Sequence, residues 1–128
     1  MRYDEFLAQV RDRGSYADQA EAERVTRTVL GLLGERLAGG EVKDLASQLP
    51  AELQDSLLTV ADNAEGYGVE EFLRRLAQRL DATEETARWD ASAVLTTVAD
   101  AISGGELNQL LSQLPTAYAE LFGKPELA

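Results

Sequence analysis

The feature that most constrains this chain is a repeat within its own sequence. The Gly-Gly-Glu segment at 39–41 recurs at 104–106, and the Ser-Gln-Leu-Pro segment at 47–50 recurs at 112–115. Both pairs are separated by the same 65 residues. A solenoid needs about three or more repeats to bury its faces, so two copies predict a duplication inside a single domain, residues 1–128, with repeat one at 1–62 and repeat two at 67–123.

The spacing of apolar residues predicts helices throughout. Tyr3, Phe6, Leu7 and Val10 follow the i, i+3, i+4, i+7 pattern, and a similar pattern recurs from residue 69. Longer apolar stripes run over 25–37 and 87–102, whereas no window alternates with the two-residue period of strands. We therefore expect an all-α protein of about eight helices, arranged as two tandem four-helix repeats that pack with pseudo-twofold symmetry in one compact domain.

Polar residues and glycines predict where the long helices begin and end. Asp18 with Glu21, and Asp81 with Glu84, have the spacing of a capping box, and so predict the two starts. The glycine pairs at 39–40 and 104–105 are predicted to end these helices, since glycine tolerates the left-handed conformation of a helix C-cap.

A proline and a glutamine recur where the fourth helix of each repeat should begin. Pro50 and Pro115 fit the first helical position, where the missing N–H group costs nothing. Gln48 and Gln113 have no such account. We expect these glutamines to hydrogen-bond a loop backbone rather than a ligand.

With these repeated segments and the opening YDEFLAQVRDRG in view, the chain resembles the DUF2267 family of uncharacterised bacterial proteins. The similarity covers nearly the whole chain. The resemblance implies an all-helical bacterial protein and brings no assigned activity, cofactor or catalytic residue.

The composition removes most familiar catalytic groups. The chain has no cysteine and no histidine, which excludes thiolate nucleophiles and the commonest general base and metal ligand. The neighbouring carboxylates at 70–71 and 84–85 point about 100° apart on a helix, so they do not converge on one substrate atom. We expect no enzyme and no cofactor. A carboxylate-based hydrolase would require a folded cluster of acids with raised pKa values.

A metal site would have to be built from oxygen ligands alone. The junction between the repeats carries several such groups, but Ala64 and Gly66 stand in ligand places of the calcium-binding loop pattern, and Tyr67 replaces its turn glycine. We therefore expect no metal site there. The oxygen-bearing residues of the junction are Asp62, Asn63, Glu65, Glu70 and Glu71.

The charge balance limits the partners. A net charge of −11 opposes binding to nucleic acid and to anionic membranes, and the chain start does not resemble a secretory signal. We expect a cytoplasmic monomer or homodimer. The most basic segment holds Arg74, Arg75 and Arg79, and an ion pair between Glu71 and Arg75 is favoured there over an anion or partner contact.

Trp89 is the most informative single residue. It falls near the polar face of its helix, and its counterpart 65 residues earlier is Arg24. It either contacts a partner or is covered by a neighbouring helix or the other repeat, and the second interpretation is favoured. Tyr67 and Tyr16, both in predicted loops, are further candidate partner contacts.

The predicted function is a non-enzymatic protein-interaction module with an unknown protein partner. The alternative is a small-molecule or lipid carrier with an apolar cavity between the repeats.

Overall fold

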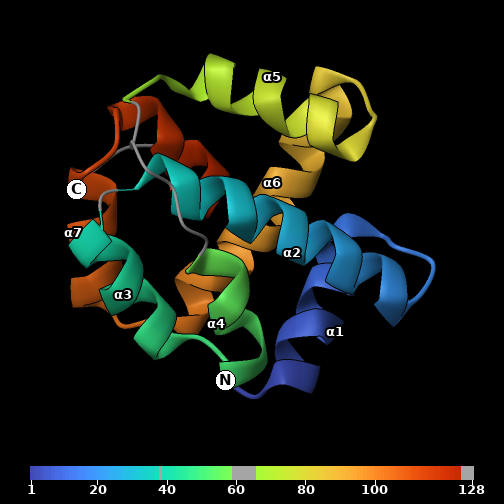
Figure 1. Cartoon of the computed structure of the whole chain (residues 1–128). Coiled ribbons are helices and arrows are strands. Elements are labelled where there is room, and N and C mark those ends of the chain that lie inside the picture. The colour runs from blue at the N-terminus through green and yellow to red at the C-terminus, as the bar shows by residue number, and fades with distance from the viewer. Residues whose placement is uncertain (38, 59–65, 125–128) are drawn as a thin grey trace.

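The apolar stripes form helices in the computed structural model, which describes residues 1–37, 39–58 and 66–124 (Figure 1). Apolar side chains at helical spacing gather on one face of each helix and are buried together, which removes them from water. The elements are α1 (Tyr3–Gly14), α2 (Gln19–Arg36), α3 (Gly39–Gln48), α4 (Ala51–Leu57), α5 (Val69–Leu80), α6 (Glu84–Ala101), α7 (Gly104–Ser112) and η1 (Thr116–Phe122).

The all-α prediction is confirmed, because the described residues form seven α-helices and one 3-10 helix and contain no strand. The helices also recur in order and length: α1 and α5 have 12 residues each, and α2 and α6 have 18 each. The pseudo-twofold relation between the two sets stays a prediction. No helix in the described part is long and apolar enough to cross a membrane.

Two long helices form the centre of the domain. In Figure 1, α2 crosses in front of α6, and α1 packs on both of them, as does α5. Helix α4 covers α2, η1 covers α6, and α3 packs against α7. The rings of Phe72 and Tyr118 meet edge to face in the core, with centroids 5.6 Å apart. Such a pair contributes about 0.5–1.5 kcal/mol beyond the area that it buries.

The start of α2 follows the prediction, whereas the start of α6 does not. Asp18 caps α2, since its side chain accepts a hydrogen bond from the backbone N–H of Glu21. The prediction for Asp81 is wrong: this residue ends α5 in the left-handed conformation, with φ 52° and ψ 52°. The N-cap of α6 is Thr83, which accepts from the backbone N–H of Thr86 and stands 65 residues after Asp18.

The prediction that the glycine pairs end the long helices is also wrong. Helices α2 and α6 end at Arg36 and Ala101, and their C-caps Leu37 and Ile102 have extended backbone, so no left-handed residue is needed there. The glycines instead begin the third helices, at 39–40 in α3 and 104–105 in α7. Ser103 caps α7 by accepting from the backbone N–H of Glu106.

The prolines lie one position earlier than predicted. Pro50 and Pro115 are the N-caps of α4 and η1 rather than their first residues. The two elements also differ in kind, because α4 is an α-helix and η1 is a 3-10 helix.

Helix α2 approaches α4 closely at one glycine. A Cβ atom placed on Gly34 would lie 2.2 Å from the carbonyl oxygen of Leu57, far inside van der Waals contact. The same test at Gly31, one turn earlier, finds only the Ser56 carbonyl oxygen, at 3.8 Å. Gly34 is therefore the position where this contact requires the absence of a side chain.

Candidate functional site

Trp89 is exposed and held in place. Its side chain lies on α6 and is 56% exposed, so the favoured interpretation that a neighbouring helix or the other repeat covers it is wrong. The indole Nε1–H donates a hydrogen bond of 3.0 Å to the carbonyl oxygen of Gly14. Gly14 is the last residue of α1, where carbonyl groups lack a partner within their own helix. This hydrogen bond thus gives the Gly14 carbonyl oxygen a partner and orients the indole ring.

A shallow depression of about 280 Å³ lies beside this ring. Its basic edge is fixed, because the guanidinium of Arg13 donates to Thr97 Oγ1 at 2.8 Å and forms an ion pair with Asp100. These bonds join α1 to α6. We call the depression and the ring together the Trp89 surface, and its residues are Arg13, Gly14, Trp89, Ser92, Ala93 and Thr96.

Tyr16 supports this region from the loop between α1 and α2. Its hydroxyl donates a hydrogen bond of 2.5 Å to Asp90 Oδ1 on α6. Burial, and then the neighbouring Asp90, raises the pKa of Tyr16, which keeps the hydroxyl protonated as the donor. Burial likewise raises the pKa of Asp90, although the bond from Tyr16 opposes the rise. Tyr16 therefore ties its loop to α6, and its role as a partner contact stays a prediction.

Tyr67 is half-buried against cationic side chains. The guanidinium of Arg75 lies over its ring, 4.2 Å from the centroid, and that of Arg36 lies 5.3 Å away. The Tyr67 carbonyl oxygen accepts hydrogen bonds from Arg36 Nε at 2.9 Å and from the Tyr118 hydroxyl at 3.0 Å. These contacts explain why this loop residue is packed. Nothing in them tests its predicted role in partner binding.

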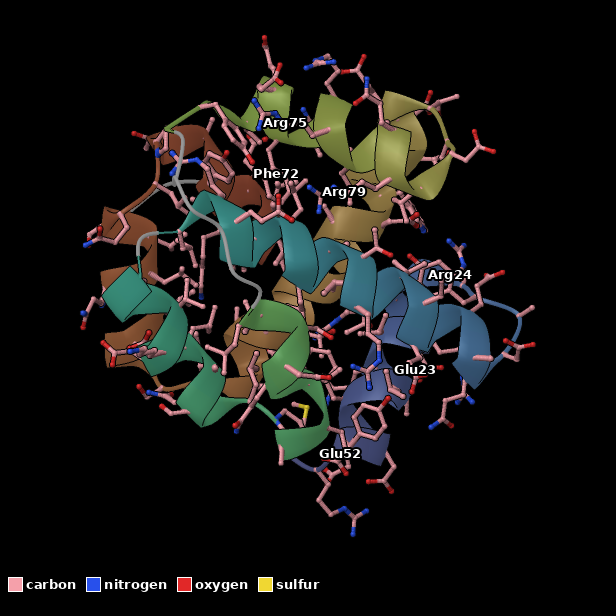
Figure 2. All side chains as sticks on the ribbon, in the orientation of Figure 1. Glu23, Arg24, Glu52, Phe72, Arg75 and Arg79 are labelled. Carbon is pink, nitrogen blue, oxygen red and sulfur yellow. The ribbon has the colours of Figure 1, made fainter. Side chains whose placement is uncertain are left out.

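The basic segment of α5 is held by carboxylates, as predicted. Glu71 accepts hydrogen bonds from Arg74 and from Arg75, the latter at 2.7 Å, and these two arginines lower its pKa to about 2. Arg79 makes two hydrogen bonds of 2.6 Å to Glu35 of α2. Figure 2 shows Arg75 and Arg79 along α5, above α2. The bonds of Arg74 and Arg75 to Glu71 therefore lie within α5, whereas the bonds of Arg79 to Glu35 tie α5 to α2.

The structure also brings together two glutamates that the sequence analysis did not single out. Glu41 of α3 and Glu106 of α7 are only 6% and 8% exposed, and one carboxyl oxygen of each is buried without a hydrogen-bond partner. Burial, and then the neighbouring Glu106, raises the pKa of Glu41 to about 7. The signal in the sequence was the recurrence of a glutamate beside an apolar residue, Val42 or Leu107, at equal offset.

A capping box shared between the two repeats explains why Glu106 faces inward. In an ordinary box the glutamate reaches back to the N–H of its own capping residue, here Ser103. That N–H instead donates to Oε1 of Gln48, at 2.8 Å. The prediction that Gln48 bonds a loop backbone is thereby confirmed. For Gln113, the equivalent backbone position is residue 38, which lies outside the described residues.

The junction acids give no metal centre in the described part of the chain. Asp62, Asn63 and Glu65 lie outside it, while Glu70 and Glu71 begin α5 as acidic residues of a first helical turn. Across residues 1–37, 39–58 and 66–124, no group of three or more carboxylates could hold a metal ion. The predicted apolar cavity for a carried ligand stays untested.

A family model described as "Uncharacterized conserved protein (DUF2267)" matches residues 3–121, nearly the whole chain. No curated protein matches this chain.

Proposed function

The chain belongs to the DUF2267 family of uncharacterized conserved proteins, and from that premise we propose that it is a non-enzymatic protein-interaction module that binds its partner through the Trp89 surface. The single observation that carries this proposal is an exposed tryptophan whose ring is already oriented. Among the described residues, the exposed large hydrophobic ones are Met1, Leu58 and Trp89, and of these only Trp89 lies within a helix.

The hydrogen bond to Gly14 matters for binding energy. Tryptophan is enriched among the few residues that contribute most of the affinity of an interface. Ordering a mobile side chain on binding costs about 0.5–1.5 kcal/mol, and here the bond from Nε1 restrains the ring before any partner arrives. Arg13, which also lines the depression, is restrained by its ion pair with Asp100.

The chemistry of the surface indicates the kind of partner. The depression beside the ring is lined by the small residues Ser92, Ala93 and Thr96, and the Thr96 hydroxyl donates to the Leu121 carbonyl oxygen at 3.4 Å. The molecule as a whole carries a net charge of −11, which attracts a basic surface and speeds its encounter. We expect a protein that inserts one apolar side chain beside Trp89 and carries a net positive charge.

The same features favour binding over catalysis. The paired carboxylates of Glu41 and Glu106 are almost wholly buried, which closes them to a substrate. The chain has no histidine or cysteine that could serve as base or nucleophile beside them.

We also propose that the two four-helix repeats are related by a pseudo-twofold axis. The support is the exchange of contacts, since α1 packs on α6 while α5 packs on α2, and since α2 meets α6 and α3 meets α7. A crystal structure in which the two halves fail to superpose would contradict this part of the proposal.

The test of the function is capture of the partner with the tagged chain from the cells that express it. We would compare wild type, Trp89→Ala and Arg24→Ala. Arg24 is the matched control, because it is exposed at the equivalent position of α2 (Figure 2). A hot-spot tryptophan contributes about 2 kcal/mol or more, so Trp89→Ala should weaken binding by about thirtyfold, whereas Arg24→Ala should retain it.

Trp89 also provides a direct readout, because it is the only tryptophan of the chain. Its fluorescence should shift to shorter wavelength when the captured partner covers it. A partner that binds Trp89→Ala as tightly as wild type, with no shift in the wild-type emission, would overturn the proposal.

A further inference from the structure

We propose that Glu41 and Glu106 form a proton-sharing carboxyl pair that makes the contact between α3 and α7 a pH-sensitive joint. These two buried groups lie outside the Trp89 surface and have no role in the proposed function. The proposed role is regulatory, because protonation of the pair changes how stably α3 packs against α7.

Helices α3 and α7 pack against each other, and each carries one glutamate of the pair in its first turn. Both side chains are more than nine-tenths buried, and Oε1 of each lacks a hydrogen-bond partner. Two carboxylates that share a buried site do not both ionise readily, because each charge disfavours the other and neither is hydrated. One proton held between them removes that conflict.

The groups around the pair add to this conflict more than they relieve it. Asp44, one turn further along α3, adds negative charge near Glu41 and raises its pKa, while the neighbouring Gln109 side chain of α7 lowers it. The other charged side chains of α3, and those of α4 and η1, which pack on α3 and α7, all lie at the surface; they are Lys43, Glu52, Asp55 and Glu120.

The joint lies at one end of the molecule, and its apolar side chains are part of the single core. In Figure 1, α3 and α7 lie together at the end of the molecule opposite α1. Helix α3 packs mainly on α4 and α7, and α7 mainly on α3 and η1. Gln48 adds one polar tie across the same contact, through the backbone N–H of Ser103.

The direction of the pH effect follows from the raised pKa of Glu41. Burial and the neighbouring Glu106 raise it from an ordinary 4.5 to about 7. Below about pH 4.5 the group is protonated in both the closed and the open state, so the joint is at full strength. As the pH rises to about 7, the open state loses its proton first, so closure weakens steadily and then levels off above that value.

Hydrogen exchange of the intact chain at pH 5.5 and 8.5, corrected for intrinsic exchange rates, tests this proposal. Amides of α3 and α7 in the wild type should open about tenfold more at pH 8.5, while those of α2 and α6 change little. Glu41→Gln and Glu106→Gln should abolish the difference. The matched controls are Glu70→Gln and Glu85→Gln, which change exposed glutamates that also lie in first helical turns; both should keep it.

A second measurement does not depend on any variant. Carboxyl carbon NMR of the wild type should show Glu41 titrating near pH 7, well above exposed glutamates such as Glu70. A Glu41 midpoint near 4.5, or a loss of α3 and α7 protection at high pH that persists in both Glu41→Gln and Glu106→Gln, would overturn the proposal.

Discussion

The two halves of the molecule, residues 1–58 and 66–124 in the described part, share one helix order but differ in the residues at equivalent positions. Trp89 on α6 corresponds to Arg24 on α2, and Tyr118 in η1 corresponds to Leu53 in α4. The shared apolar spacing produces the same succession of helices in both halves. The differences decide where the protein is most closely packed, where it is tied by hydrogen bonds, and where an aromatic ring is exposed.

The difference with the largest expected effect on stability is at Gly34, whose counterpart in α6 is Ala99. In Gly34→Ala the new methyl group would meet the Leu57 carbonyl group at 2.2 Å, so backbone must move. We expect the free energy of unfolding to fall by about 1–3 kcal/mol, measured by denaturant titration.

The control for this prediction lies one turn earlier. Gly31→Ala has room for its methyl group and should raise stability by about 0.5–1 kcal/mol, because alanine favours a helix. If Gly34→Ala stabilised the protein as much as Gly31→Ala, the close approach of α2 to α4 at Gly34 would be contradicted.

The next difference is the hydroxyl group of Tyr118, which Leu53 lacks. It donates to the carbonyl oxygens of Tyr67 and Gly68, at 3.0 and 3.2 Å. Both oxygens keep another donor, Arg36 Nε and the Phe72 N–H respectively. Tyr118→Phe should therefore lower the free energy of unfolding by only about 1 kcal/mol. It should also make amide exchange faster at the start of α5. Unchanged exchange there would show that the hydroxyl does not hold the loop.

The smallest predicted effect concerns the caps of the two long helices, Asp18 and Thr83. Each accepts one hydrogen bond at an exposed helix start, so Asp18→Ala and Thr83→Ala should each lower the free energy of unfolding by about 0.5–1 kcal/mol. Asp18→Asn and Thr83→Ser keep the acceptor and should change little. A loss from Asp81→Ala that equals the loss from Thr83→Ala would restore Asp81 as a cap of α6.

The helices could be predicted from the sequence, whereas several helix ends and the connections between helices could not. Periodic apolar spacing is a local property, so the stripes that begin at Tyr3 and Val69 predicted α1 and α5 well. Helix ends were harder, because Asp81 and the glycine pairs are compatible with either end of a helix and the connecting backbone decides between them. The prolines were displaced by only one residue.

The candidate site shows the same division. Helical phase placed Trp89 correctly near the polar face of α6, but its exposure depends on what other helices cover, and the favoured interpretation of cover was wrong. The pairing of Glu41 with Glu106 could not follow from spacing alone, since it needs α3 and α7 to meet across the domain. The repeat places the two glutamates at equivalent positions in the sequence. Only the contact between α3 and α7 shows that they lie together.

The exchange of contacts between the halves has a consequence for synthesis of the chain. Gly14 and Trp89, which are hydrogen-bonded, are 75 residues apart in sequence, so α1 leaves the ribosome well before the helix that covers its second face. At about 5–20 residues per second, the interval is about 4–15 s. During that time α1 has α2 and the smaller contact with α4, but not α6, to shelter its apolar stripe. A nascent chain that stalls before α6 is complete would therefore be the form most exposed to aggregation.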